Sequence, residues 1–416
     1  MNTYPNRPED VPEEESNQKE AEFSSQEEVE NEAPKSPKSD SGWKKVVALL
    51  GVIILVAGLA WWFTSRSDES GEDKLIDVNK GNEMGKQEPI NQGDVSPISG
   101  LACENWNRRP VAVMQPSDSQ ARPPAGMSEA DMVVEMPVLT TGFTRLMAVY
   151  VCGTPPEVGS MRSARPDFVH LAKGMDAIFT HWGRAELDSF VGNLNDGVID
   201  NLNCNNDAGQ SARECCFRKE GMSRGVDSGY AKFDELLKCA EEFGYRTENR
   251  FGGYPHQQEA PIEQRPEKAN LEVGYPGDLK VIYDYDQENN EYVRYWGGVK
   301  HTDRNNEEVV AAKNIVVLIA KDNNMEEDPH YNNMELGDPW YDQTESGEAY
   351  FYMNGKEIKG RWSKDSSKVD SKLMLMDENG REIKFVPGQI WLNVVYPNMK
   401  LDWDEGKTAE EELSAA

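Results

Sequence analysis

Basic residues are scarce in this sequence of 416 residues. Lys and Arg together number 44, against 74 Asp and Glu, so the formal net charge is -30 at pH 7. Nucleic-acid binding depends on lysine and arginine to neutralise phosphates, and docking on anionic lipid headgroups uses the same charges. The composition therefore excludes nucleic acid as a general partner and argues against a purely electrostatic attachment to membranes.

Motifs for cofactors and metals are also missing. The sequence contains no P-loop and no glycine-rich dinucleotide fingerprint, and its cysteines lack the paired C-x-x-C spacing of a structural zinc site. His330 has three aspartates close to it in the sequence, but such a group is more often a solvated loop than a metal site. We therefore predict no cofactor and no bound metal.

A single long apolar run, residues 46–63, contains 18 residues without a charge, which is enough to span a bilayer as one helix. Lys44 and Lys45 precede it, whereas Arg66 alone follows closely, so the positive-inside rule places the amino terminus in the cytoplasm. We predict a single-pass protein of the cell membrane with its main domains extracytoplasmic. A cleaved signal segment is the alternative.

All six cysteines lie after this run, on the extracytoplasmic side of the predicted membrane helix. An even number of cysteines in such a compartment is compatible with up to three disulfides, although the sequence does not choose among the pairings. Cys215 and Cys216 are adjacent, and we predict that they do not pair with each other.

The fold class that these patterns predict is α+β or α/β, with a mostly β carboxyl-terminal part. Short alternating strands and the turns Asn354-Gly355 and Asn379-Gly380 mark that second part. The regions we predict, in chain order, are a disordered acidic cytoplasmic tail (1–45), a transmembrane helix (46–63), a flexible stalk (64–107), an α/β domain (108–250), a linker (251–275), a mostly β domain (276–400) and a disordered tail (401–416).

Two arginines precede a predicted helix in the segment 159–182. Pro166 suits the first turn of a helix, and Arg162 and Arg165 lie just before it. The first N–H groups of a helix lack partners and carry the positive end of its dipole, so together with the arginines they favour an anion. The segment is therefore a candidate anion-binding site, and Ser163 is a candidate helix cap.

Strand patterns flank this helix on both sides. The strand 144–151, the arginine loop, the helix and the strand 177–182 predict a crossover unit with two parallel strands. The loop and His181 would then lie at the carboxyl ends of neighbouring strands, where ligands of open α/β sheets gather. His181 is a candidate catalytic residue because histidine titrates near neutrality.

Each candidate also has a structural interpretation. Arg162 and Arg165 could pair with carboxylates such as Asp167 or Glu135 and hold the loop closed. Glu135, near the end of the second predicted strand, is a candidate acid or base if it is buried, or else a partner of Arg145 across a hairpin. The sequence does not decide between these interpretations.

The order of several segments is recognisable. The first predicted domain contains RPVAVM, ARPPAGMSEADMVVEM, GFTRLMAVYV and VGSMRSARPDFVHLAKGMDAIFTHWG. The second contains YDYDQENNEYVRYWGGVKHTD, AAKNIVVLIA, GEAYFYMNGKEIKGRW and MDENGREIKFVPGQIWLNVV. In this order the segments resemble the YerB-like lipoproteins, a bacterial envelope family of unknown function, over about residues 108–397.

The resemblance implies an architecture and a location rather than a reaction. It implies a layered α/β sandwich for the first domain and places six candidates on family motif positions. The four candidate ligand-binding residues are Arg145, Arg162, Ser163 and Arg165. The two candidate catalytic residues are Glu135 and His181. The chain departs from the family by its predicted transmembrane helix in place of a lipidated cysteine, and by Asp227, which replaces a family histidine.

Three functional hypotheses follow from the sequence. The first is a membrane-anchored envelope protein that binds an anionic ligand, such as a cell-wall component, through Arg162, Arg165 and His181. The second is a cell-wall hydrolase or lyase that acts at the same crevice with Glu135 or His181. The third is a protein-binding assembly factor of the envelope, without a small ligand.

Overall fold

The computed structural model describes residues 94–415 apart from 186–187, 206–210, 223, 325–329 and 341–343. The predicted tail 1–45 and transmembrane segment 46–63 lie outside these residues. Within the described part of the chain, no helix is both long and apolar enough to cross a membrane. The described residues belong to one compact unit.

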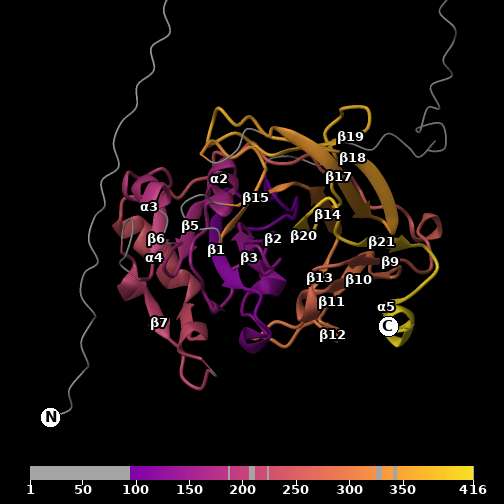
Figure 1. The fold of residues 1–416 in the computed structure, drawn as a ribbon, viewed down its shortest axis with the longest axis horizontal. Coiled ribbons are helices and arrows are strands. Elements are labelled where there is room, and N and C mark those ends of the chain that lie inside the picture. Colours follow the sequence, from indigo (N-terminus) through magenta and orange to yellow (C-terminus); the bar gives the residue numbers. More distant parts are fainter. Residues whose placement is uncertain are drawn as a thin grey trace, which may run out of the picture. The chain divides into compact units, whose positions relative to one another are not determined.

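A ten-stranded central sheet runs through this unit and contains strands from both halves of the chain (Figure 1). Strands β2 and β20 are parallel neighbours, and Met132 lies opposite Ile390. The predicted α/β and β regions therefore share one sheet. Its strands, in spatial order, are β19 (Met374–Asp377), β18 (Lys356–Ser363), β17 (Ser346–Met353), β14 (Asn314–Ile319), β20 (Ile390–Val395), β2 (Met132–Pro137), β3 (Thr144–Tyr150), β1 (Val111–Pro116), β5 (Ile178–His181) and β6 (Asn201–Asn203).

A second sheet of six strands is built from the carboxyl-terminal half. Its main path is β12 (Val299–Lys300), β11 (Glu291–Trp296), β10 (Val281–Asp286), β9 (Asn270–Val273) and β21 (Leu401–Asp404), with β13 (Ala311–Ala312) paired to β11. Two smaller sheets consist of β4 (Val158–Gly159), β8 (Gly229–Ala231) and β7 (Cys216–Arg218), and of β15 (Asp322–Asn324) and β16 (Asn332–Met334).

Helices are few and short, so the fold is mostly β. The described α-helices are α2 (Pro166–Gly174), α3 (Asp188–Asn195), α4 (Phe233–Glu242) and α5 (Ala409–Ala415). The 3-10 turns are η1 (Ser119–Ala121), η2 (Met127–Glu129), η3 (Arg213–Cys215), η4 (Gly225–Asp227), η5 (Ile262–Gln264) and η6 (Gly277–Leu279).

The central sheet is covered on both faces. Successive side chains of a strand point to opposite faces, and accordingly Val111 and Val113 pack in one core whereas Ala112 and Met114 pack in the other. The first core also contains residues of the second sheet and of α4, and the other core contains Phe168 and further residues of α2. The layers are therefore sheet on sheet on one side, and helix and loops on sheet on the other.

The predicted crossover between strand 144–151 and strand 177–182 was wrong about the strand partner. Strand β5 pairs in parallel with β1, whereas β3 runs antiparallel to β1 and to β2. Both edges of β3 are occupied by these two strands, so β5 has no free edge there. The carboxyl end of β5 therefore lies beside the carboxyl end of β1.

Local elements around α2 agree with the sequence in part. Pro166 occupies the first turn of the helix as predicted, but Arg165 is at the N-cap position and no side chain caps the helix. The prediction of Ser163 as the cap was therefore wrong. The main-chain oxygen of Ser163 instead accepts a hydrogen bond from Arg145 Nη1 at 3.0 Å.

Several segments predicted to lack structure are ordered parts of this unit. In the predicted stalk, Ile98 is fully buried. In the predicted linker, Phe251 and Tyr254 pack in the core. The terminal segment 401–416 contributes β21 and α5. The order of these segments could not be predicted from their local composition, because it depends on packing against distant parts of the chain rather than on their own periodicity.

Three disulfides connect all six cysteines. The pairs are Cys103–Cys152, Cys204–Cys216 and Cys215–Cys239. The prediction that the adjacent Cys215 and Cys216 do not pair with each other is confirmed. Two of the three bridges hold the long polar segment between β6 and α4.

Candidate anion-binding site

The arginine loop, residues 162–165, is fixed across the carboxyl ends of β1 and β5. The backbone N–H of Arg162 donates to Met114 O at 2.9 Å, at the end of β1. After β5, Trp182 N donates to Arg162 O at 2.9 Å, and Ala164 N donates to Gly183 O at 2.9 Å. The loop therefore reaches the edge that the sequence predicted, although β1 rather than β3 brings it there.

A pocket of about 270 Å³ opens beside this loop. Three arginines contribute to its wall, and Trp182 provides an aromatic surface. The residues that line it are Met161, Arg162, Ser163, Trp182, Gly183, Arg184, Asn205, Arg218 and Val226. The positively charged lining is consistent with an anionic ligand.

Arg162 belongs to an ion-pair network on one side of this pocket. It pairs with Asp118 at 3.1 Å and with the fully buried carboxylate of Asp227. Arg224 pairs with the same two aspartates, at 3.0 and 2.5 Å. Burial alone would raise the pKa of Asp118, but hydrogen bonds and charges from Arg224 and Arg162 outweigh burial and lower it.

This network tests the interpretation that Arg162 pairs with carboxylates and holds the loop closed. Arg162 does hold the loop closed, but its partners are Asp118 and Asp227 rather than Asp167 or Glu135. The residue that departs from the family pattern, Asp227, thus serves as a buried counterion. Arg162 is therefore positioned by carboxylates and contributes little uncompensated charge to the pocket.

Arg165 ends the loop and Arg145 bonds to it, and neither forms an ion pair with any described residue. The Arg165 residue is 7 % exposed, its Nη1 donates to Ala164 O at 2.8 Å, and its guanidinium lies 4.7 Å from the Tyr331 ring centroid. Burial lowers the pKa of Arg165 to about 10. Burial, followed by the charges of Arg165 and Arg162, holds the pKa of Arg145 well below its ordinary value.

The Nε atoms of these two arginines are buried and make no hydrogen bond to the described protein. A buried cation without a counterion costs free energy because it has lost its hydration. Here two such cations lie close enough to repel each other. Neither arginine is among the residues that line the pocket, so each adds to the positive potential of the site from behind its lining.

Arg218 provides a further positive charge in the pocket. Its guanidinium stacks on the Trp182 ring at 3.9 Å, and its Nη1 donates to Gly225 O at 3.0 Å. It forms no ion pair within the described part of the chain. Burial, followed by the nearby charge of Arg162, lowers its pKa. Stacking on an indole holds the planar guanidinium in place for a ligand.

The two candidate catalytic residues lie in the core instead of the pocket. His181 is fully buried, with Nδ1 2.6 Å from Gly183 O and Nε2 3.3 Å from Asn201 Oδ1. It is not among the residues that line the pocket. Its ring is thus bonded behind the loop that forms the pocket.

Glu135 is fully buried between the two large sheets. Its Oε2 accepts a hydrogen bond from Arg294 Nη2 at 2.6 Å, and its Oε1 accepts one from Thr144 Oγ1 at 2.9 Å. The predicted pairing with Arg145 was therefore wrong, because Arg145 bonds to the arginine loop at Ser163 O, whereas Glu135 pairs with Arg294 from β11 of the second sheet. The structure brings together Arg145, Arg162, Ser163 and Arg165, but not Glu135.

Sequence reasoning missed several members of the site, among them Asp118, Trp182, Arg184, Arg218 and Arg224. A usable signal existed in the polar segment between β6 and β8. Three arginines fall between residues 213 and 224 in an otherwise acidic chain, beside two adjacent cysteines. Such a concentration of positive charge in a disulfide-held loop indicates a binding surface.

Comparison with known proteins gives two family matches and one relative of known structure. Residues 98–246 match the N-terminal domain, and residues 271–392 the C-terminal domain, of the "Protein of unknown function (DUF3048)" family. The chain is 29 % identical over 312 residues to the Bacillus subtilis (strain 168) protein described as "Putative lipoprotein YerB", covering 72 % of this chain and 86 % of the relative.

The fold is similar to the crystal structure of YerB protein from Bacillus subtilis. The TM-score is 0.62 at 27 % identity, and the match covers 74 % of this chain and 99 % of that one. Both family domains are matched in order. The chain therefore belongs to the DUF3048 family, and it is similar to YerB along most of the length of that protein.

Proposed function

We propose that this chain is a membrane-anchored extracytoplasmic protein of the cell envelope that binds an anionic ligand at the arginine loop. The relative described as a lipoprotein supports the envelope location. Three disulfides support an oxidising compartment, because such bonds persist mainly outside the cytoplasm. The predicted transmembrane helix would supply the anchor.

The observation that carries the binding proposal is the positive charge at this loop, where Arg218 lines the pocket and Arg145 and Arg165 lie behind its lining. These guanidiniums surround one short loop, and none of them forms an ion pair within the described residues, in a chain whose net charge is -30. Arginine presents a planar fork that matches the oxygens of phosphate and carboxylate. The ligand is therefore a phosphate or carboxylate group, for example one carried by cell-wall material.

Binding is proposed in preference to catalysis because of where Glu135 and His181 lie. Each is fully buried and hydrogen-bonded away from the pocket. A general acid or base has to come within hydrogen-bond distance of the substrate. An enzyme at this crevice would need other groups for proton transfer.

Calorimetric titration of the full chain with pyrophosphate tests the proposal. Replacing Arg218 by methionine should weaken binding at least tenfold, about 1.4 kcal/mol, because the substitution removes a charge-assisted partner from the pocket lining. Replacing Arg165 by methionine should weaken binding to a smaller extent, because it removes a positive charge behind that lining. Arg361→Met is the matched control, since Arg361 is exposed on β18, and it should leave the affinity unchanged. Equal affinity of the wild type, Arg165→Met and Arg218→Met would overturn the proposal.

The pH dependence of sulfate binding separates the arginines from His181. The pKa of Arg165 is about 10, so its positive charge persists at neutral pH and is lost only as the pH rises through that value. Sulfate keeps its charge over the whole range. The affinity should therefore be constant between about pH 6 and pH 9. A requirement for a protonated histidine would instead appear as a loss of affinity with rising pH within this interval.

A further inference from the structure

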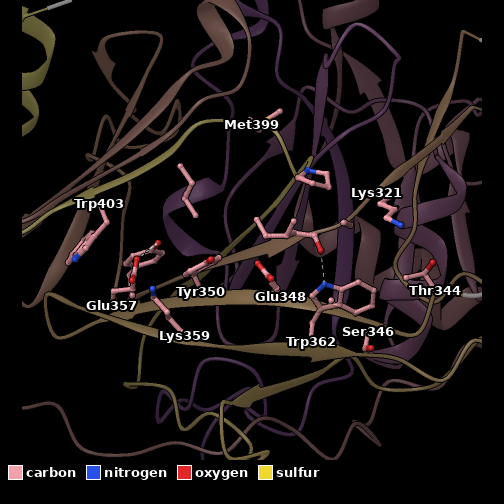
Figure 2. A pocket seen from close by; sticks show the side chains of 16 residues that line it. Lys321, Thr344, Ser346, Glu348, Tyr350, Glu357, Lys359, Trp362, Met399 and Trp403 are labelled. Atoms are coloured by element: carbon pink, nitrogen blue, oxygen red, sulfur yellow. Dashed lines mark hydrogen bonds between the residues drawn. The ribbon is translucent and has the colours of Figure 1, made fainter.

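A second and larger pocket lies in the carboxyl-terminal half of the chain, beside strands β17 and β18 of the central sheet. Its volume is about 730 Å³, and it is bordered by β17 and β18 on one side and by residues 397–403 on the other (Figure 2). We call it the β17–β21 groove. It is lined by Ile319, Ala320, Lys321, Thr344, Ser346, Gly347, Glu348, Tyr350, Tyr352, Glu357, Lys359, Trp362, Pro397, Met399, Leu401 and Trp403.

Aromatic side chains follow one another along this groove. Figure 2 shows Trp403 toward one end, Tyr350 in the middle and Trp362 toward the other end. Trp403 is packed against Tyr352, with ring centroids 4.9 Å apart, and this contact fixes its indole. Tyr350 is half-buried and its hydroxyl makes no hydrogen bond to a described residue. The groove therefore presents flat apolar surfaces with one polar group ready for a ligand.

The polar ends of the other aromatic residues are already satisfied. Tyr352 donates its hydroxyl to Glu357 Oε2 at 3.0 Å, and Trp362 Nε1 donates to Ile319 O at 3.0 Å. These bonds hold the rings in one orientation without using the groove surface. A ligand would meet a preformed floor, which reduces the entropy cost of binding.

The charges of the groove are balanced, in contrast to the arginine loop. Its lining contains two lysines, Lys321 and Lys359, and two glutamates, Glu348 and Glu357. No ion pair between these four is present among the described residues, and Glu357 already accepts the Tyr352 hydroxyl, so Lys321, Lys359 and Glu348 remain available to a ligand. A ligand of either charge would meet repulsion as well as attraction. A purely apolar ligand would desolvate four charges without compensation.

We propose that the β17–β21 groove binds a neutral saccharide chain. The apolar faces of sugar rings would stack on Tyr350 and Trp403, and their hydroxyls would bond to Glu348, Lys359 and the Tyr350 hydroxyl. Tyr and Trp supply such surfaces with little loss of rotamer entropy. The volume lies within the range of about 300 to 1,000 Å³ that is usual for ligand sites. This site is separate from the arginine loop and does not depend on it.

The test is titration of the full chain with two neutral tetrasaccharides, one of β-1,4-linked N-acetylglucosamine and one of α-1,4-linked glucose. Tryptophan fluorescence should report saturable binding of at least one of them, unchanged by high salt because the ligand is uncharged. Tyr350→Ala and Glu348→Ala should each weaken binding about tenfold. Tyr350→Phe should retain most of the affinity, because the stacking surface remains.

Glu348 is exposed, so Glu348→Ala keeps the test valid even if loss of a tyrosine disturbs the fold. Arg165→Met should leave saccharide binding intact, which separates this inference from the proposed anion site. Absence of saturable binding of both tetrasaccharides would overturn the inference, as would equal affinities of the wild type, Tyr350→Ala and Glu348→Ala. Saturable binding of an uncharged extended peptide without saccharide binding would also overturn it.

Discussion

Replacing Glu135 by alanine should lower the free energy of unfolding by about 3 to 5 kcal/mol. The substitution removes the counterion of Arg294, which is itself fully buried. Arg294 would remain between the rings of Trp296 and Trp391, 4.5 and 4.3 Å from their centroids, with no carboxylate. His301 could not serve as a counterion in place of Glu135. Burial and the charge of Arg294 hold the pKa of His301 well below the ordinary value, so its ring is neutral.

Denaturant unfolding of the full chain measures this effect, with Glu348→Ala as the control for loss of an exposed glutamate. The double variant Glu135→Leu, Arg294→Met should recover most of the stability, because replacing a buried ion pair by apolar residues is often neutral. A loss below about 1 kcal/mol for Glu135→Ala would contradict the structural role assigned to this pair.

Removing the disulfide between Cys215 and Cys239 should lower the free energy of unfolding by about 3 kcal/mol. The bridge closes a loop with a sequence separation of 24 residues, and its loss gives the unfolded chain more conformations. That loop contains Arg218, Arg224 and Asp227. The double variant Cys215→Ser, Cys239→Ser should therefore also weaken pyrophosphate binding about tenfold.

The disulfide between Cys103 and Cys152 provides the matched control. It has a sequence separation of 49 residues and encloses none of the residues that line the pocket. Arg145 does lie between its ends, but the pairing of β3 with β1 and β2 holds that residue in place. Its removal should reduce stability to a similar extent but leave pyrophosphate affinity nearly unchanged while the protein is folded. If both double variants bind pyrophosphate equally well, the Cys215–Cys239 bridge does not hold the anion site.

Features determined by short-range chemistry could be predicted from the sequence. The turn at Asn354 and Gly355 is one example, since both residues have positive φ and Met353 pairs with Lys356 across the hairpin. The start of α2 at Pro166 is another. Each depends on residues that are neighbours in the chain, so local patterns are sufficient to find it.

Features determined by pairing between distant segments could not be predicted. The neighbour of β5 depends on the fact that β1 and β2 already occupy both edges of β3. The partners of Arg162 lie 44 and 65 residues away, at Asp118 and Asp227. In a chain with 74 acidic residues, every arginine has many equivalent candidates, and the three-dimensional arrangement alone selects among them.

The parallel pairing of β2 with β20 has a consequence for how proteins of this kind can evolve. If either strand were absent, the other would become the exposed edge of a sheet. Val134 of β2 and Leu392 of β20, which lie opposite each other in this pairing, are almost completely buried. An edge of that composition invites aggregation. We therefore expect evolution to keep the two family segments together, because either segment moved alone into another gene would carry an unprotected apolar edge.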